Sequence, residues 1–207
     1  MKASLQEPFS SYIIRKLGTD ETVKSFDCGD ADLNDFILNE AGPYREALLA
    51  VTYVFETADD ENHEHIAAYF SLANDRVSMS DFPNKTEFNR FRKHRFVNEK
   101  RLKSYPAAKI CRLAVSQNLK GRHLGEFLIR AIKSFFIADN KTGCRFLTVD
   151  AYSAAIPFYL KQKFVPLTVE DEGAVTRLLC YGRNSKRLVC GGFCKNGLPD
   201  TWKGFFW

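Results

Sequence analysis

Six consecutive residues near the middle of the chain have the character of an anion-binding loop. They combine two glycines with three side chains that carry, or can acquire, positive charge: Lys120, Gly121, Arg122, His123, Leu124 and Gly125. Backbone N–H groups of such a loop converge on an anion, and the start of a following helix adds partial positive charge. We therefore expect this loop to bind a phosphate-bearing ligand. An ordinary tight turn between a strand and a helix is the alternative interpretation.

The residues around this loop predict the elements that position it. Apolar residues dominate from Ile110 to Val115, which favours a buried strand. After the loop, apolar residues recur every three or four positions, at Leu124, Phe127, Leu128, Ala131, Ile132 and Phe135. This period marks one buried face of a helix, and residues 139–143 supply typical helix-stop signals. Residues 145–150 predict a further strand, which a right-handed crossover makes parallel to the first.

The loop does not match the two best-known nucleotide-binding patterns. In the phosphate loop of nucleotide hydrolases, four residues separate two glycines, whereas Gly121 and Gly125 are one residue too close and Glu126 follows. The dinucleotide pattern Gly-x-Gly-x-x-Gly is also absent. The loop resembles instead the pyrophosphate loop of the GCN5-related N-acetyltransferases (GNAT), Arg/Gln-x-x-Gly-x-Gly/Ala. Lys120 stands in the first slot, and His123 replaces the middle glycine.

A second segment, from Asp150 to Phe164, resembles another motif of the same superfamily, Asn-x-x-Ala-x-x-Phe-Tyr-x-Lys-x-Gly-Phe. The matching residues are Ala155, Phe158, Tyr159, Lys161 and Phe164. Tyr152 replaces the asparagine, and Lys163 replaces the glycine. One helix and one strand separate the two motifs, as the superfamily requires. The resemblance implies a mixed α/β GNAT fold, in which helices flank a mostly antiparallel central sheet with one parallel, splayed strand pair.

Three further phrases resemble the toxin-type branch of the superfamily, whose members acetylate aminoacyl-tRNA. They are Phe26–Ile37, Ile66–Ala73 and Arg112–Val115. The resemblance implies an acyl-CoA-dependent enzyme that transfers an acetyl group from acetyl-CoA to a primary amine. The amino group of aminoacyl-tRNA is one acceptor, and a small-molecule or protein amine is another. An antitoxin partner is a property of that branch for which the sequence holds no sign.

The resemblance implies a role for each site residue. The backbone of Lys120–Gly125 holds the pyrophosphate of coenzyme A. The strand at Leu113, Ala114 and Val115 runs beside the pantetheine arm, where its backbone supplies hydrogen bonds to the thioester. Tyr159 is the candidate general acid for the leaving thiolate, and a structural tyrosine packed in the core is the alternative. Direct attack by the amine is expected, because no cysteine has a Cys/His nucleophile setting, and no metal is expected.

Composition indicates a globular protein of the cytoplasm. The 207 residues are 45% hydrophobic and 27% charged, and they suffice for one domain with a full core. No apolar run approaches the roughly 20 residues of a membrane span, so no membrane partner is expected. Residues 1–8 lack the apolar core of a signal peptide. The six cysteines form no Cys-x-x-Cys pair and are expected to be reduced and structural.

Positive charge is concentrated between residues 85 and 103. The net charge is +5, and this segment contains eight Lys or Arg residues but only Glu87 and Glu99 as acidic residues, with phenylalanines interleaved. A surface that binds tRNA is one interpretation. A solvated helix with its aromatic residues turned inward is the other.

The remaining patterns predict one domain over residues 1–183. Strands are expected over residues 12–17, 47–56, 64–74, 164–169 and 174–181, the last four as two hairpins, and short helices are expected after Asp30 and over residues 153–162. Asp27 and the other acidic residues near Asp30 are attributed to helix capping and to the helix dipole. Residues 184–207 form an aromatic tail, which is expected to pack on the domain or on the partner of a homodimer.

The departures from the family motifs support a second hypothesis. His123, Tyr152 and Lys163 are the kind of changes that loss of catalysis would leave. On this hypothesis the chain is a catalytically eroded GNAT-fold module that binds RNA or a protein partner.

Overall fold

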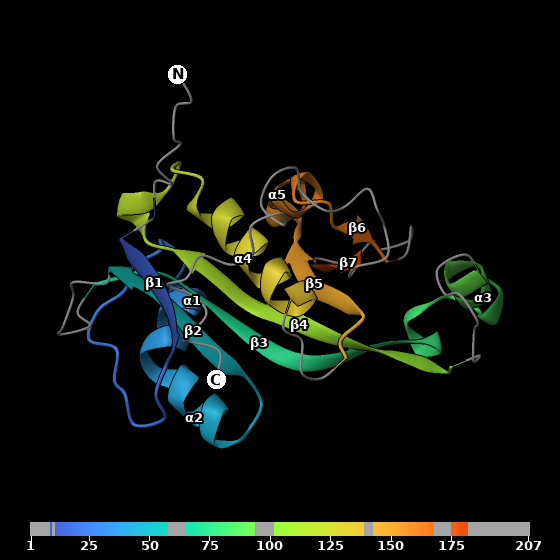
Figure 1. Ribbon diagram of the computed structural model, residues 1–207, viewed down its shortest axis with the longest axis horizontal. Coiled ribbons are helices and arrows are strands. Elements are labelled where there is room, and N and C mark those ends of the chain that lie inside the picture. The colour runs from blue at the N-terminus through green and yellow to red at the C-terminus, as the bar shows by residue number, and fades with distance from the viewer. Residues whose placement is uncertain are drawn as a thin grey trace. The chain divides into compact units, whose positions relative to one another are not determined.

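The computed structural model describes residues 9, 11–57, 65–93, 102–138, 143–167 and 175–181 (Figure 1). Among these residues, no helix has the length and apolar character needed to span a bilayer. The expected aromatic tail and the domain boundary at residue 183 lie outside the described residues, and so do residues 94–101 of the basic segment.

The described strands form one mixed sheet with the order β1-β2-β3-β4-β5-β7-β6. Their bounds are β1 Tyr12–Lys16, β2 Val51–Thr57, β3 Ile66–Ser78, β4 Ser104–Val115, β5 Phe146–Tyr152, β6 Val165–Pro166 and β7 Val175–Tyr181. The pairs β1–β2, β5–β7 and β6–β7 are antiparallel, whereas β4 and β5 are parallel. This arrangement confirms the predicted fold class, a mostly antiparallel sheet with one parallel pair.

Helices join these strands. The α-helices are α1 Ala31–Asp35, α2 Ala41–Glu46, α3 Lys85–Lys93, α4 Leu124–Ala138 and α5 Ile156–Lys161, with a π-helical turn at Phe36–Glu40 and 3-10 turns at Met79–Asp81, Gln117–Leu119 and Ser153–Ala155. Asp30 caps α1 as predicted, because its carboxylate accepts the backbone N–H of Leu33 at 3.1 Å. Pro157 lies in the first turn of α5, where a missing N–H costs nothing.

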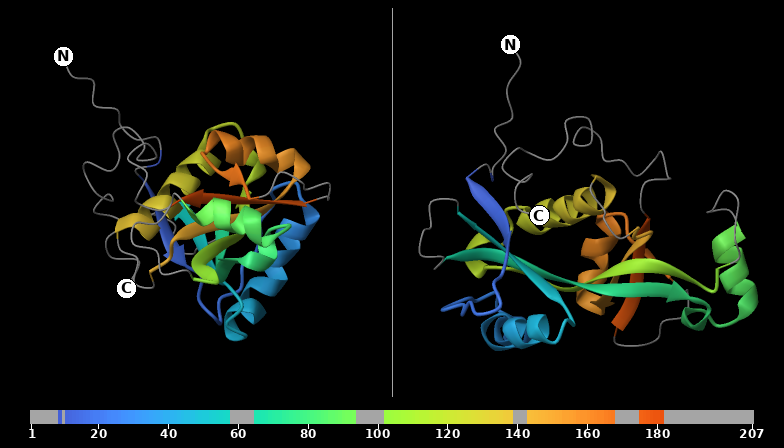
Figure 2. Two further views of the ribbon diagram at one scale, coloured as in Figure 1. Left: turned by 90° about the vertical axis from the view of Figure 1, so that its right-hand side faces the viewer. Right: turned by 60° about the horizontal axis from the view of Figure 1, so that its bottom comes forward.

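The described residues divide into two compact units. The first reaches Ser71 and includes Arg112–Gly125, and the second includes Leu72–Cys111 and the described residues from Glu126 to Tyr181. The long strands β3 and β4 are neighbours in the sheet and pass through both units, as their continuous paths in Figure 2 show.

Each unit has its own core. In the first unit, α1 and the π-helical turn pack against the sheet through Phe36, Val54, Tyr69 and Ala114. The buried Tyr69 hydroxyl donates a hydrogen bond to the Leu33 carbonyl at 2.6 Å, which ties β3 to the first helix. The core of the second unit is largely aromatic; it contains Phe88, Phe91, Tyr105 and Phe146.

Several predicted elements differ in extent from the structure. β3 runs to Ser78 rather than to residue 74, and within the described residues 164–167, β6 covers only Val165–Pro166 of the strand expected over 164–169. β4 begins at Ser104, six residues before the apolar run expected from Ile110 to Val115, so Pro106 lies inside the strand. A proline fits within a strand where its ring nitrogen is not needed for the ladder, and the Pro106 carbonyl still accepts the N–H of Arg145 at 2.9 Å. The expected strand over 47–56 begins only at Val51, because Leu48 has φ of 55° as the chain leaves α2.

Candidate functional site

The predicted phosphate loop connects β4 to the 15-residue helix α4. Lys120, Gly121, Arg122 and His123 are all exposed, while Leu124 is 1% exposed and anchors the first turn of α4. Gly121 has φ of 77°, in the left-handed region that favours glycine. The loop therefore presents cationic side chains at the start of a long helix, where backbone N–H groups favour an anion.

A 3-10 turn holds the base of this loop. The Ser116 N–H donates to the Ala67 carbonyl of β3 at 2.9 Å, and the Leu119 and Lys120 N–H groups donate back to Ser116 and Gln117 at 3.0 and 3.2 Å. The loop thus starts from a point that is fixed to the sheet.

The segment before α1 is attached to the same turn through Asp27. The Asp27 carbonyl accepts the N–H of Gln117 at 2.9 Å, and its carboxylate accepts the Gln117 side-chain amide at 2.8 Å. The same carboxylate accepts the Gly29 N–H at 2.7 Å and the Asn34 amide at 3.0 Å. These hydrogen bonds, with that from Gly29 first, and the nearby Lys120 ammonium lower the pKa of Asp27 below its usual range.

Gly29 allows this close contact. Its φ is 79°, and a Cβ at this position would lie 3.1 Å from the Gln117 side-chain nitrogen and 3.5 Å from the Lys120 ammonium. The sequence pattern attributed Asp27 to helix capping and the helix dipole, and the structure corrects this: Asp30 caps the helix, whereas Asp27 links the first helical segment to the turn before the phosphate loop. The spacing Asp27-x-Gly29 was the only signal of this role in the sequence.

We expect Asp27→Ala to lower Tm by about 3 °C or more, because three donors lose their acceptor, while the same change at exposed Asp20 leaves Tm nearly unchanged. Since the folded-state pKa of Asp27 is lowered, its stabilisation is present above a pH of about 4. It is lost as the pH falls through that lowered pKa. Thermal unfolding across pH 2–7 should show the Tm of Asp27→Ala approaching the Tm of the wild type in acid. An equal gap at all pH values would contradict the role of the charge.

The predicted pantetheine strand is the end of β4. Ala114 is 4% exposed and packs into the first core, whereas Leu113 and Val115 are half-buried. β4 pairs with β5 over Ala107–Ile110 and continues for five residues beyond this pairing.

Tyr159 lies on α5, in the second unit. Its side chain is 7% exposed, and its ring makes edge contacts with Phe158 and Phe164, with centroid distances of 5.0 and 5.4 Å. Burial raises the pKa of Tyr159 to about 12. The phenol is therefore protonated throughout the neutral range.

The structure brings some predicted site residues together. Leu113, Ala114 and Val115 share the first unit with the loop Lys120–Gly125, and only Ser116 and the turn Gln117–Leu119 separate them. Tyr159 belongs to the second unit, and its membership of one site with the loop stays a prediction. Among the described residues, no group of three or more His, Cys, Asp or Glu side chains is arranged to hold a metal ion.

Residues 50–164 match the model of the acetyltransferase (GNAT) family, and this match covers more than half of the chain. The chain belongs to the GNAT family. No protein with a curated description matches the chain in sequence.

Solved structures of GNAT-like toxins share the fold. AtaT complexed with acetyl-methionyl-tRNAfMet is 21% identical, with 82% of this chain and 94% of that chain covered and a TM-score of 0.62. AtaTR bound with AcCoA is 22% identical, with 81% and 92% covered and a TM-score of 0.60. A tyrosine-to-phenylalanine mutant of KacT is 21% identical, with 83% and 95% covered and a TM-score of 0.61. At these identities the likeness establishes the fold alone.

Two departures from the GNAT motifs preserve the backbone that glycine would give. His123 and Lys163 replace glycines, and they have φ of 59° and 65°. Histidine is enriched in the left-handed region among non-glycine residues. Both positions therefore adopt the left-handed conformation that glycine favours.

Lys163 also completes the turn that positions Tyr159. The Lys163 N–H donates to the Leu160 carbonyl at 3.0 Å, and the Phe164 N–H donates to the Tyr159 carbonyl at 3.1 Å. These two bonds and the Tyr159–Phe164 ring contact form a Schellman motif at the end of α5. The left-handed residue thus closes the helix over the buried tyrosine.

We expect Lys163→Gly to increase the free energy of unfolding by about 1 kcal/mol, because glycine removes the left-handed strain at an exposed position. The neighbouring change Gln162→Gly, at φ of −82°, should instead reduce it by roughly 0.5–1 kcal/mol. Urea unfolding of the two variants measures both effects. A loss of stability in Lys163→Gly would show that the lysine side chain is required there.

Proposed function

We propose that this GNAT-family enzyme transfers an acetyl group from acetyl-CoA to a primary amine, and that the acceptor is the amino group of an aminoacyl-tRNA. The main support is the exposed cationic loop Lys120–His123, which leads into α4 with left-handed backbone at Gly121 and His123. Further support comes from two proteins of the same fold, AtaTR bound with AcCoA and AtaT complexed with acetyl-methionyl-tRNAfMet.

The loop binds the pyrophosphate of the cofactor. Its backbone N–H groups and the start of α4 bind the two phosphates, and Lys120, Arg122 and His123 add positive charge. The adjacent end of β4 accompanies the pantetheine arm. Because β4 runs five residues past its pairing with β5, its backbone groups there are suited to hydrogen-bond the pantetheine amides and the thioester carbonyl.

The chemical step is direct aminolysis. The amine nitrogen attacks the thioester carbon, the C–S bond breaks, and the amine proton passes to water. An α-amine with a pKa of roughly 8 needs no stronger base than water. The negative charge that leaves with sulfur is the charge that the enzyme must stabilise.

Tyr159 is the group that we assign to the leaving sulfur. Burial holds its pKa at about 12, whereas a free thiol has a pKa of roughly 8.5. Complete proton transfer to the thiolate is therefore uphill by roughly 5 kcal/mol. The phenol acts as a general acid only in part: its O–H donates a hydrogen bond that strengthens as the C–S bond breaks.

Positive charge on α3 supports a polyanionic acceptor. The aromatic residues of this helix, Phe88 and Phe91, are buried in the second core, so they do not offer stacking surfaces. Arg90 is 74% exposed, although it also pairs with Glu87 at 2.8 Å. The described part of the basic segment therefore contributes charge rather than base stacking, and its contact with tRNA would depend on salt.

Turnover with defined acceptors tests this proposal. Acetyl-CoA is incubated with aminoacyl-tRNA, uncharged tRNA, a polyamine and a peptide with a free N-terminus, and thiol release is measured. We expect turnover with the charged tRNA and none with uncharged tRNA. Thiol release with only the polyamine or the peptide would support acetyltransferase activity but would contradict aminoacyl-tRNA as the acceptor. Absence of acetyl-CoA binding would favour the eroded binding module.

Partner proteins stay predictions. One solved structure of this fold is a tyrosine-to-phenylalanine mutant of the AtaT toxin bound to the C-terminus of the antitoxin AtaR and acetyl-CoA. A homodimer and an antitoxin are the corresponding expectations for this chain, and size-exclusion chromatography with light scattering measures the first of them.

A further inference from the structure

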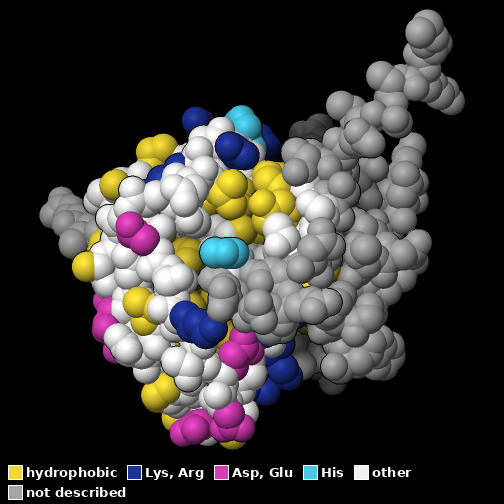
Figure 3. Space-filling view, turned by 90° about the vertical axis from the view of Figure 1, so that its left-hand side faces the viewer, with side chains coloured by type: hydrophobic (Ala, Val, Ile, Leu, Met, Phe, Trp, Pro, Cys, Tyr) yellow, Lys and Arg dark blue, Asp and Glu magenta, His cyan; other side chains and the backbone are white. Residues whose placement is uncertain are grey.

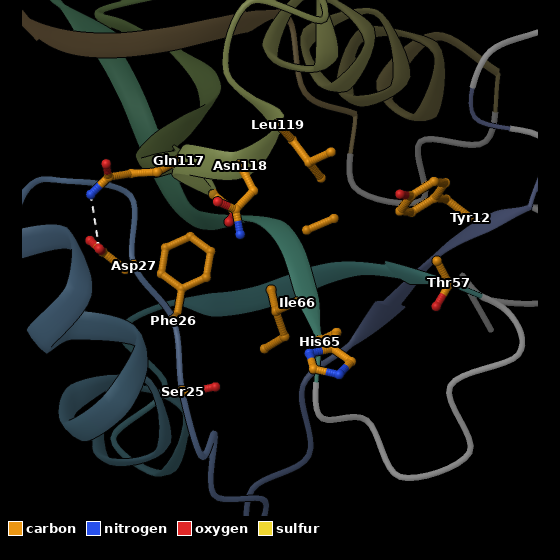
Figure 4. A pocket seen from close by; sticks show the side chains of 12 residues that line it. Tyr12, Ser25, Phe26, Asp27, Thr57, His65, Ile66, Gln117, Asn118 and Leu119 are labelled. Atoms are coloured by element: carbon orange, nitrogen blue, oxygen red, sulfur yellow. Dashed lines mark hydrogen bonds between the residues drawn. The ribbon is translucent and has the colours of Figure 1, made fainter.

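A pocket of about 520 Å³ lies in the first unit, directly before the phosphate loop (Figure 4). Phe26 and Ile66 contribute apolar walls, and Asn118 and Leu119 of the 3-10 turn lie across from them. Tyr12 and Thr57, from the ends of β1 and β2, line the opposite end. Its volume falls in the range of pockets that bind small organic groups, roughly 300–1,000 Å³.

The lining selects for a neutral ligand. The lining residues that the structure describes include no lysine or arginine. Among the described lining residues, Asp27 contributes the single carboxylate, and it already accepts hydrogen bonds from Gly29, Asn34 and Gln117. The remaining polar groups are hydroxyl, amide and imidazole groups around apolar and aromatic surfaces. Such a pocket suits a flat group with apolar faces and hydrogen-bonding edges, because both kinds of surface find partners.

Positive charge begins where the pocket ends. Leu119 lines the pocket, and the next four residues are the exposed Lys120, Gly121, Arg122 and His123. The Lys120 ammonium also acts electrostatically on the carboxylate of Asp27 in the pocket wall. Figure 3 shows a face of the molecule on which hydrophobic side chains gather beside histidine and basic side chains. A neutral, partly aromatic pocket next to a cationic loop complements the two parts of a nucleotide.

We propose that this pocket binds a nucleobase whose phosphate lies against the loop Lys120–His123. The base packs on Phe26, and its polar edge faces Asn118 and Thr57. This inference rests on the proposed function, which supplies two sources of the same chemistry: the adenine of coenzyme A and the terminal bases of aminoacyl-tRNA. An aliphatic side chain is a poorer occupant, because it offers no hydrogen bond to the amide of Asn118 or the hydroxyl of Thr57.

Filling the pocket tests the proposal. Asn118 is exposed at the pocket edge, so Asn118→Trp places an indole in the space that the base would occupy, whereas Asn118→Ala keeps the space open. Both variants are first compared with the wild type by thermal unfolding. Calorimetry then measures binding of two probes, adenosine 3′,5′-bisphosphate and the trinucleotide CCA.

We expect Asn118→Trp to weaken at least one probe by tenfold or more relative to Asn118→Ala, which loses only the amide contact to the base. Loss of the bisphosphate alone identifies the adenine of coenzyme A as the occupant. Loss of CCA alone identifies the acceptor end of the tRNA. If neither probe binds the wild type, or if both bind Asn118→Trp as tightly as they bind Asn118→Ala, the proposal is wrong.

A separate measurement distinguishes this failure from failure of the proposed function. Acetyl-CoA binding that is intact in the wild type and sensitive to substitution of Gly121 supports the phosphate loop whatever the pocket binds. If filling the pocket then changes the affinity of neither probe, the nucleobase assignment is wrong, whereas the proposed acetyltransferase activity remains supported. If acetyl-CoA does not bind the wild type at all, the proposed function falls first. Should the Asn118→Trp protein be unfolded, Ser25→Trp provides a second filled pocket from the opposite wall.

Discussion

Replacing Tyr159 with phenylalanine should reduce kcat by roughly 10²–10³ while leaving acetyl-CoA affinity nearly unchanged. The substitution removes one hydroxyl from a side chain that is 7% exposed and held between Phe158 and Phe164, so the ring contacts are kept. If the phenol donates to sulfur only as the C–S bond breaks, its loss raises the barrier without weakening the ground-state complex. Steady-state kinetics and calorimetry of the cofactor separate the two quantities.

Tyr152 provides the matched control. It lies in the same motif, at the slot where the family pattern has asparagine, but its side chain is 66% exposed. Tyr152→Phe removes the same hydroxyl and should leave kcat within about twofold. Equal losses in the two variants would point to a general effect on this segment. A wild-type rate in Tyr159→Phe would remove the phenol from the mechanism and leave it as a core residue.

The raised pKa of Tyr159 also predicts a pH dependence. The phenol has a pKa of about 12 in the folded protein and about 10 in an unfolded chain. Its neutral form is favoured by folding, so this contribution to stability is complete below pH 10 and is lost as the pH rises toward 12. Below pH 10, no loss of rate should arise from ionisation of Tyr159. Alkaline unfolding of the wild type should therefore begin at lower pH than that of Tyr159→Phe, and coincident curves would refute the assignment of the pKa.

The sequence predicted the elements of the fold because their signals are local. The apolar period of α4, the cap at Asp30 and the proline at the start of α5 depend only on neighbours along the chain. The two motifs added the order of elements that a GNAT fold requires, and the parallel pairing of β4 with β5 confirms it. The extension of β4 through Pro106 was not predictable, because whether a proline fits in a strand depends on which side of the ladder its nitrogen faces.

The departures from the motifs show what local patterns leave out. His123 and Lys163 differ from the family glycines in residue type, and on that basis they suggested erosion. Their φ values of 59° and 65° lie in the left-handed region that glycine favours. A motif records residue types, whereas the loop and the helix end require a left-handed conformation, which several residue types adopt at some cost.

The contacts of the first unit were hidden for a different reason. Asp27 and Gln117 are 90 residues apart in the chain, yet their side chains meet at 2.8 Å. The pocket combines Tyr12, Phe26 and Asn118 from three separate segments. No periodicity or spacing in the sequence predicts such long-range contacts, because they form only when the sheet places distant segments side by side. The residues of the phosphate loop were therefore predictable from the sequence, whereas the residues from other segments that contact the turn before it were not.

Gly121→Val should weaken acetyl-CoA binding by about tenfold or more, and Gly121→Asn by no more than about threefold. Gly121 has φ of 77°, and a Cβ there meets nothing within 4 Å, so the constraint is conformational rather than steric. A β-branched residue is a strained outlier in this region, whereas asparagine adopts it readily. Because the loop is exposed, the valine variant can relieve its strain by rotating the backbone, and this turns the N–H groups away from the phosphates.

Binding of the cofactor would then have to restore the strained conformation, at a cost of roughly 1–2 kcal/mol, which corresponds to about a tenfold loss of affinity. Calorimetry with acetyl-CoA measures this difference, and thermal unfolding should show little change because the strain is relieved in the free protein. Equal affinity of the valine and asparagine variants would mean that the loop side chains, rather than its backbone, hold the phosphates. In that case Lys120→Ala and Arg122→Ala should weaken acetyl-CoA binding by more than Gly121→Val does. One series of variants therefore separates phosphate binding by backbone N–H groups from phosphate binding by cationic side chains.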